Sequence, residues 1–236
     1  MTTFVLLHGA FHGGWCWSRV AALLRARGHA AFTPTQTGLG ERAHLLSRAI
    51  TLDTFVADLT GVLEAEELHD AVLVGHSFGG IAVTGAADRM PARIRSLIYL
   101  DSVIPQNGYT PLDLSQPDIA AERRRLAAAD GGLAVAPPDP GHYGVPPGPD
   151  ADWARRRMSP HPFGALDSSL RLGHPPGNGL PCTYVVCTAP IYQPLALHRE
   201  YARAQPGWGW RELAAGHDAM ITAPAATAAL LMELAP

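Results

Sequence analysis

The pentapeptide GHSFG at residues 75–79 constrains the fold of this chain more than any other part of its sequence. It follows the apolar run AVLV (71–74), which is typical of a buried strand, and it precedes a helical pattern that runs to about Met90. A sharp turn from a strand into a helix strains its central residue, and the residues two positions away must be small because they pass close to neighbouring strands. Glycine occupies both of those positions. The pattern therefore predicts a strand, a tight turn and a helix, with the Ser77 side chain projecting at the carboxyl end of the strand.

Short apolar runs bounded by Gly or Pro alternate with longer helical patterns over most of the chain. The predicted strands are 4–7, 30–33, 71–74, 96–100, 183–187 and 210–213, and the predicted helices are 17–27, 52–68, 78–90, 194–204 and 224–234. Continuous apolar runs of this length are typical of parallel strands that are buried on both faces and connected by helices. The sequence therefore predicts an α/β fold with a mostly parallel sheet.

The alternation stops between about residues 103 and 180. Within this region, the stretch APPDPGHYGVPPGPD (136–150) is too rich in Pro and Gly for a regular element. Insertions of this length inside a compact domain are usually either functional or disordered. We therefore expect a small cap inserted at 103–180, ordered in part by short helices around 122–129 and 152–158.

Composition limits the classes of partner. With 236 residues, 47% of them apolar, the chain is long enough for one well-buried domain, which we expect over 1–236. The 18 basic and 21 acidic residues provide no basic field, so neither nucleic acid nor membrane is an expected partner. We interpret the arginine runs 123–125 and 155–157 as solvated helix faces.

The cysteines and the apolar segments indicate the compartment. Cys16, Cys182 and Cys187 have neither metal-ligand spacing nor the even number of a disulfide framework. No segment reaches the roughly 18 apolar residues of a spanning helix, and no signal-peptide pattern is recognisable. We therefore expect a cytoplasmic protein, and nothing in the sequence calls for a metal or other cofactor.

A serine hydroxyl becomes a strong nucleophile when a histidine removes its proton. Of the eleven histidines, His217 has the expected position, because it follows the last predicted strand in a glycine-containing loop, RELAAGHDAM. His76, inside the turn, is expected to have a packed or hydrogen-bonded core role. His8 and His12 are four residues apart but lie on no predicted helix, so a metal-binding pair is not expected.

A tetrahedral intermediate needs two hydrogen-bond donors directed at its oxyanion. The residue after the nucleophile supplies one, here the backbone N–H of Phe78. The second is expected from the glycine-rich loop LLHGAFHGG (6–14) after the first strand. Ala10 is the predicted donor, with Phe11 as the alternative.

Four motifs together resemble the small α/β-hydrolases related to plant hydroxynitrile lyases and methyl-salicylate esterases, with bacterial esterases of that group most similar. They are HGAFHGGWCW (8–17), TGLGER (37–42), GHSFGG (75–80) and GHDAM (216–220). The resemblance spans nearly the whole chain. It implies an α/β-hydrolase fold with a six-stranded sheet, helices on both faces, a small cap and chemistry without a cofactor. It also implies that Ala10 and Phe78 form the oxyanion hole.

The same resemblance disfavours cyanohydrin cleavage. Hydroxynitrile lyases of this type carry a threonine at the position of Gly9 and a lysine directly after the catalytic histidine, where this chain has Asp218.

The third catalytic residue is the point where the sequence departs from the usual family pattern. The loop that ordinarily carries the acid, CTAPIYQP (187–194), contains no Asp or Glu, and Glu200 lies too far along the next helix. Asp101 ends the predicted strand beside that of the nucleophile, at the same edge of the sheet. We therefore expect Asp101 to orient His217. The alternatives are a dyad without an acid and, less favoured, Asp218.

These residues predict a serine esterase that cleaves a small hydrophobic or aromatic ester through an acyl-enzyme. Phe11, His12 and Trp15 are expected to line the acyl pocket. Two other functions remain open: a lyase, cyclase or decarboxylase that uses the same site, and a hydrolase-fold protein that only binds a ligand. The expected partner is a small-molecule ester, and a homodimer is left open.

Overall fold

Six parallel strands form the central sheet of the computed structural model, which describes residues 1–235. In spatial order the strands are β2 (Ala30–Phe32), β1 (Thr3–Leu7), β3 (Ala71–His76), β4 (Ile94–Leu100), β7 (Cys182–Cys187) and β8 (Gly209–Leu213). Every neighbouring pair in this sheet is parallel. The predicted six-stranded α/β-hydrolase sheet is confirmed.

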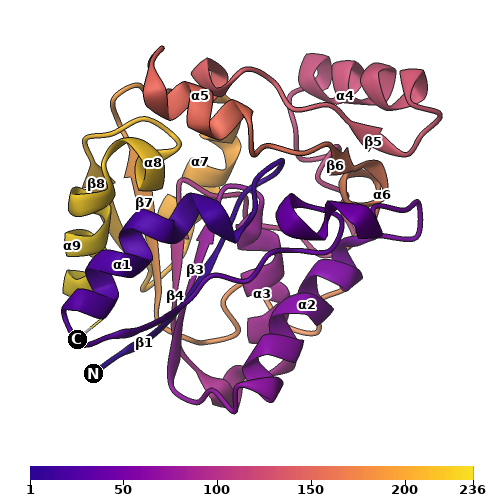
Figure 1. Cartoon of the computed structure of the whole chain (residues 1–236). Helices are drawn as coiled ribbons and strands as arrows, with labels where there is room; N and C mark the ends of the chain where they lie inside the picture. Colours follow the sequence, from indigo (N-terminus) through magenta and orange to yellow (C-terminus); the bar gives the residue numbers. More distant parts are fainter. Residues whose placement is uncertain (236) are drawn as a thin grey trace.

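Helices cover both faces of this sheet (Figure 1). They are α1 (Ser18–Ala26), α8 (Ala219–Thr222) and α9 (Pro224–Leu234) on one face, and α2 (Leu52–Ala65), α3 (Gly79–Arg89) and α7 (Ala196–Ala204) on the other. Short 3-10 helices occur at Gly14–Trp17, Gly40–Leu45, Pro91–Arg93 and Gln193–Leu195. Each helix predicted for the core is present, and α8 is an addition that the sequence did not predict.

The central strand β3 shows why its sequence is continuously apolar. Successive side chains of a strand point to opposite faces. Val72 and Val74 pack with α1 and α9, whereas Leu73 packs with α2 and α3. All three side chains are fully buried, and burying each contributes about 1.5–3 kcal/mol. A helix-covered sheet therefore requires apolar residues at every position of this strand.

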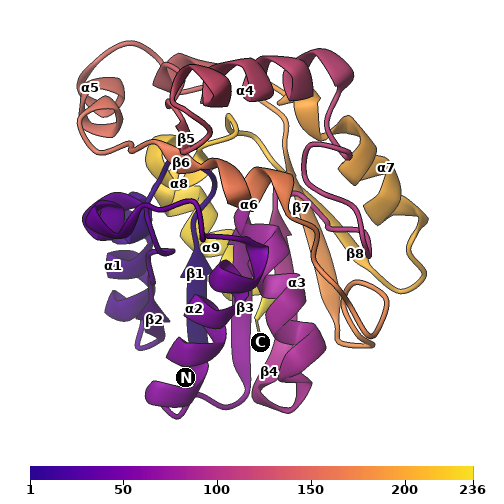
Figure 2. The same cartoon turned by 90° about the vertical axis from the view of Figure 1, so that its right-hand side faces the viewer.

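Most of the segment between β4 and β7 lies beyond the carboxyl ends of the strands, and its last part returns along the sheet to the start of β7, as Figures 1 and 2 show. It contains α4 (Pro117–Ala129), β5 (Ala134–Val135), a 3-10 helix (Pro140–Tyr143), α5 (Pro149–Arg155), β6 (His161–Pro162) and α6 (Phe163–Asp167). Strands β5 and β6 form a small antiparallel pair. We call this segment, residues 103–180, the insertion.

The insertion is more regular than the sequence suggested. The stretch 136–150, predicted to hold no regular element, contains a 3-10 helix and the start of α5. Pro140 and Pro149 each stand in the first turn of a helix, where the N–H that proline lacks would have no partner anyway. Proline therefore begins these helices, and α4 likewise begins at Pro117. Among the described helices, none is long and apolar enough to cross a membrane.

Candidate active site

Ser77 lies on the tight turn between β3 and α3. Its backbone has a positive φ of 50°, which is unfavourable for a residue with a side chain. The turn is held from the next strand, since the Ser77 N–H donates to the carbonyl of Leu100 at 3.2 Å and the Ser102 hydroxyl donates to the Ser77 carbonyl at 2.7 Å. At Gly79 a Cβ atom would lie 2.7 Å from the carbonyl oxygen of His8. This contact explains the glycine two positions after the serine.

Ser77, His217 and Asp101 form one hydrogen-bonded chain above the sheet. The Ser77 Oγ lies 2.9 Å from Nε2 of His217, and Nδ1 of His217 lies 2.7 Å from Oδ2 of Asp101. A carboxylate only accepts hydrogen bonds, so Nδ1 carries the imidazole proton and Nε2 is free to accept from the serine. His217 and Asp101 are buried, whereas Ser77 is partly exposed.

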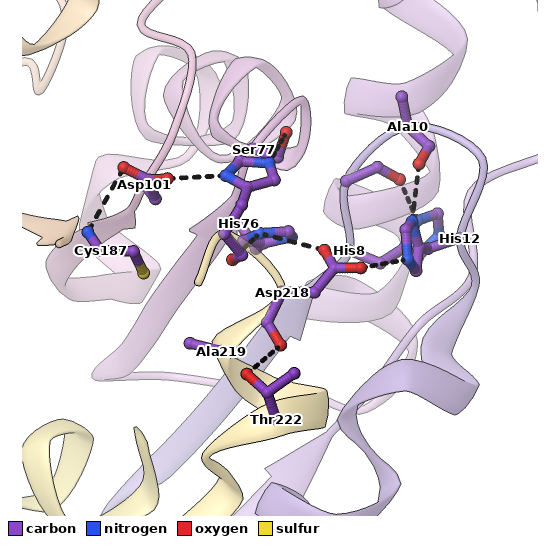
Figure 3. Close-up of polar contacts among 12 residues, drawn as sticks. His8, Ala10, His12, His76, Ser77, Asp101, Cys187, Asp218, Ala219 and Thr222 are labelled. Carbon is purple, nitrogen blue, oxygen red and sulfur yellow. Dashed lines mark hydrogen bonds and ion pairs between the residues drawn. The ribbon is translucent and has the colours of Figure 1, made fainter. Parts of the chain in front are cut away.

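Asp101 reaches His217 from the end of β4, the strand next to β3. Its N–H donates to the carbonyl of Val185 at 2.7 Å, and its Oδ1 lies 3.5 Å from the N–H of Cys187 (Figure 3). Its φ is also positive, at 39°. The loop after β7 contains no acidic residue, and the Asp101 carboxylate contacts Nδ1 of His217 from the end of β4 instead.

Two backbone N–H groups beside Ser77 have no acceptor within the described residues. They belong to Ala10 and Phe78, and both residues border the cavity that contains the Ser77 side chain. The alternative donor, the N–H of Phe11, instead points to Nδ1 of His161 at 3.5 Å. The geometry therefore offers Ala10 and Phe78 as the available pair of donors.

Two histidines hold the loop that carries the Ala10 N–H. Nδ1 of His8 donates to the Gly9 carbonyl at 2.8 Å, while its Nε2 accepts from the N–H of Gln36 at 3.0 Å. His8 is therefore neutral, and burial lowers its pKa to about 3. Nδ1 of His12 donates to the Ala10 carbonyl, also at 2.8 Å. The peptide groups on both sides of Ala10 are thus fixed in orientation.

His12 also reaches the residue after His217. Its Nε2 lies 3.1 Å from Oδ2 of Asp218, and both side chains are buried (Figure 3). Both ring nitrogens of His12 face acceptors, so the ring is an imidazolium. Burial alone would lower the pKa of His12, but the Asp218 carboxylate raises it above the ordinary value. Conversely, burial would raise the pKa of Asp218, and His12 holds it below the ordinary value.

His76 has the core position expected for it. It is buried, and its Nε2–H donates to the carbonyl of His217 at 3.0 Å. His76, His217 and Asp218 bring potential metal-ligand atoms within 4.8 Å of one another. Both nitrogens of His217 already contact Ser77 and Asp101. A metal ion bound there would therefore break the chain of hydrogen bonds.

Two neighbouring cavities share part of their walls, and the inner one contains the Ser77 side chain. The inner cavity, of about 40 Å³, is bounded by Ser77, Ala10 and Phe78. The outer cavity, of about 480 Å³, is bordered by α4 and by residues 135–138. Four residues line both cavities: Ile119, Arg123, Tyr143 and Tyr192. The Tyr192 ring stacks on the His217 ring with centroids 4.2 Å apart, so it covers the histidine from the side of the cavities.

Of the three residues predicted to line the acyl pocket, one borders a cavity and two do not. Phe11 borders the outer cavity. His12 and Trp15 border neither cavity, which corrects the prediction for both. His12 is drawn away by Asp218, and Trp15 stacks on His12 at 5.2 Å and packs edge-on against Trp153 at 4.9 Å. Sequence reasoning missed Tyr143 and Tyr192, because nothing in the loop sequences indicates that their rings meet above His217.

A serine on a strand-to-helix turn, hydrogen-bonded to a histidine and an aspartate above a parallel sheet, is the arrangement of the α/β-hydrolases. The chain belongs to this family, since the model of the alpha/beta hydrolase family matches residues 4–230.

Individual relatives fall in the group that the motifs indicated. Over 231 residues the chain is 37% identical to a carbendazim-hydrolysing esterase of Nocardioides sp. (strain SG-4G), covering 95% of this chain and 96% of that one. It is 34% identical over 109 residues to the α-hydroxynitrile lyase of Arabidopsis thaliana, or 46% of this chain and 42% of the lyase. An extracellular α/β-hydrolase from a Paenibacillus species has the same fold, with a TM-score of 0.87 at 23% identity, covering 99% and 98% of the two chains. The resemblance to this group is confirmed.

Proposed function

We propose that this protein is a serine esterase that cleaves a small hydrophobic or aromatic ester through an acyl-enzyme. The observation that carries the proposal is the hydrogen-bonded chain of Ser77, His217 and Asp101 beside the two unpaired N–H groups of Ala10 and Phe78. A nucleophile, its base and an oxyanion site are the parts that acyl transfer requires.

The geometry suggests the order of steps. The Ser77 Oγ attacks the ester carbonyl while Nε2 of His217 takes its proton, and the oxyanion forms beside the N–H groups of Ala10 and Phe78. His217 then gives the proton to the departing alcohol, which leaves the acyl group on Ser77. Water repeats the sequence and releases the acid. Asp101 keeps the His217 ring in the required tautomer and stabilises its cationic form.

The relatives support an esterase rather than a lyase. A relative that matches nearly the whole chain is a carbendazim-hydrolysing esterase. At Gly9, where hydroxynitrile lyases of this type carry threonine, a Cβ atom would lie 2.8 Å from the Cβ of Ser77. At the lysine position, Asp218 turns away from the cavities toward His12. Neither lyase feature therefore fits this site.

The test is covalent labelling with a fluorophosphonate, followed by mass spectrometry of the tryptic peptides. We expect the label on Ser77 and none in the Ser77→Ala variant. Turnover of a panel of p-nitrophenyl esters of increasing acyl length should then give a preference for short or aromatic acyl groups. An unlabelled Ser77 together with no ester turnover would contradict the proposal and favour a lyase or a ligand-binding protein.

A further inference from the structure

Arg123 brings the one permanent positive charge to the inner cavity. It lies in α4 and lines both the inner and the outer cavity. The sequence suggested a solvated helix face for residues 123–125. Arg124 and Arg125 are indeed exposed, but Arg123 is half-buried. It lies on the side of α4 that faces the two cavities.

The Arg123 guanidinium has no hydrogen-bond or ion-pair partner among residues 1–235. Its neighbour Glu122 is already engaged, since both of its carboxylate oxygens accept from Arg125 at 2.6 and 2.7 Å. Asp118 borders the outer cavity but forms no ion pair with Arg123. A guanidinium presents five N–H donors in a planar fork, and leaving them unmatched in a partly apolar site is unfavourable.

No other group cancels this charge in the inner cavity at neutral pH. Burial lowers the pKa of His198 to about 4, so its ring is neutral. Burial raises the pKa of Tyr192 to about 12 and that of Tyr143 well above its ordinary value, so both phenols keep their protons. The inner cavity has no acidic side chain among its lining residues. The wall beside Ser77 therefore carries a net positive charge.

We propose that Arg123 binds an anionic group of the substrate, and that the preferred substrates are half-esters of aromatic dicarboxylic acids. This inference rests on the esterase function proposed above. A carboxylate matches the guanidinium fork with two parallel hydrogen bonds. The inner cavity of about 40 Å³ has room for little more than the reacting group, whereas the outer cavity of about 480 Å³ has room for a ring. Arg123 lines both of them.

The reaction is ordinary hydrolysis. Water adds across the acyl C–O bond, so the acyl carbon gains the hydroxyl and the alcohol leaves with a proton. The product is a dicarboxylate, of which one carboxylate was present from the start and contacts Arg123 throughout.

The experiment compares two series of methyl esters of equal size. Methyl 3- and 4-carboxybenzoate carry the anion, and methyl 3- and 4-carbamoylbenzoate carry a neutral amide in its place. For at least one ring position, we expect the wild-type kcat/KM of the acid to exceed that of the amide by about tenfold or more, the usual effect of hydrogen bonds to a charged group.

The variants assign the preference to Arg123. Arg123→Gln should bring the ratio of acid to amide to about one, and Arg123→Lys should give an intermediate ratio because lysine keeps the charge without the fork. Arg124→Gln, an exposed change in the same helix, is the matched control and should keep the wild-type ratio. A wild-type ratio at or below one at both ring positions, or an unchanged ratio in Arg123→Gln, would overturn the inference.

A binding measurement separates this inference from the esterase proposal. In Ser77→Ala, calorimetric titration with the same acids and amides should show tighter binding of an acid, and this preference should disappear in the Ser77→Ala, Arg123→Gln double variant. If no ester is turned over and Ser77 is not labelled, the esterase proposal fails while the binding ratio still decides the role of Arg123.

Discussion

His12 and Asp218 form a buried ion pair, although 206 residues separate them in the sequence. His12 orients the carbonyl of Ala10, and Asp218 follows His217 directly. The pair therefore ties the loop that carries the proposed oxyanion donor to the loop that carries the proposed base. Removing one residue of a buried ion pair leaves the charge of the other uncompensated. The loss of either His12 or Asp218 should therefore affect both loops.

Replacing His12 should impair the reaction more than it impairs substrate binding. The bond from Nδ1 holds the Ala10–Phe11 peptide, which is joined at the Ala10 Cα to the peptide that carries the Ala10 N–H. Without this bond the donor is fixed from one side only, by the contact of His8 with the Gly9 carbonyl. His12→Ala should therefore lower kcat by about ten- to a hundredfold with little change in KM, because the oxyanion forms only in the transition state. His12→Asn places an amide N–H near the position of Nδ1 and should recover part of the loss. Steady-state kinetics on one ester measures both constants. The exposed His44→Ala is the control, and an unchanged kcat in His12→Ala would show that the loop needs no such support.

Asp101→Asn tests the proposed acid. The amide keeps the size of the side chain but donates toward Nδ1 of His217, which favours the wrong tautomer, and kcat should fall by about 10⁴. Turnover at neutral pH and thermal unfolding should be measured together, so that a loss of folding is not read as a loss of catalysis. If the folded variant keeps most of its turnover, His217 works without this carboxylate.

Gly79→Ala tests the close approach of the turn to β1. The added Cβ would lie 2.7 Å from the His8 carbonyl oxygen and 2.8 Å from that of Leu7. Relieving this overlap requires backbone movement, which should lower the free energy of unfolding by about 1–3 kcal/mol and reduce labelling of Ser77. Chemical denaturation gives the first quantity. Gly61→Ala is the control, since a Cβ there meets no atom within 4 Å. Equal stability of the two variants would contradict the steric explanation.

Buried neutral histidines should make the fold sensitive to acid. Burial lowers the pKa of His198 from 6.5 to about 4, and its Nδ1 accepts from the N–H of Ile104. Between these values the unfolded chain binds a proton that the folded chain does not. The free energy of unfolding should therefore fall as the pH drops from 6.5 to 4, by up to about 1.4 kcal/mol per pH unit for this residue.

His198→Asn keeps an acceptor for Ile104 without a titrating group, so the dependence on pH should become shallower by about one proton. Denaturation in urea between pH 4 and 7 measures this slope, with the exposed His44→Asn as control. A slope equal to that of the wild type would mean that His198 is not neutral in the folded protein.

The amino-acid sequence by itself determined the local features of this protein. The glycines around Ser77, the apolar runs and the helical spacings are set by short-range sterics and by the burial of the strands on both faces. The turn, the core strands and the core helices could therefore be predicted close to their observed places. Asp101 could be inferred as well, because parallel strands end at one edge of the sheet and the usual loop has no acid.

Only the tertiary structure decided which side chains meet across the loops. The sequence predicts that His12 lines the pocket, but its ring forms an ion pair with Asp218 instead. Asp218 lies far along the chain, so no local pattern indicates this contact. Arg123 belongs to a run of three arginines that looks solvated, and its inward position depends on how α4 lies over the cavities. Tyr192 covers His217 from a loop without a recognisable motif. Contacts of this kind depend on the packing of distant segments, for which the sequence of each loop carries no local signal.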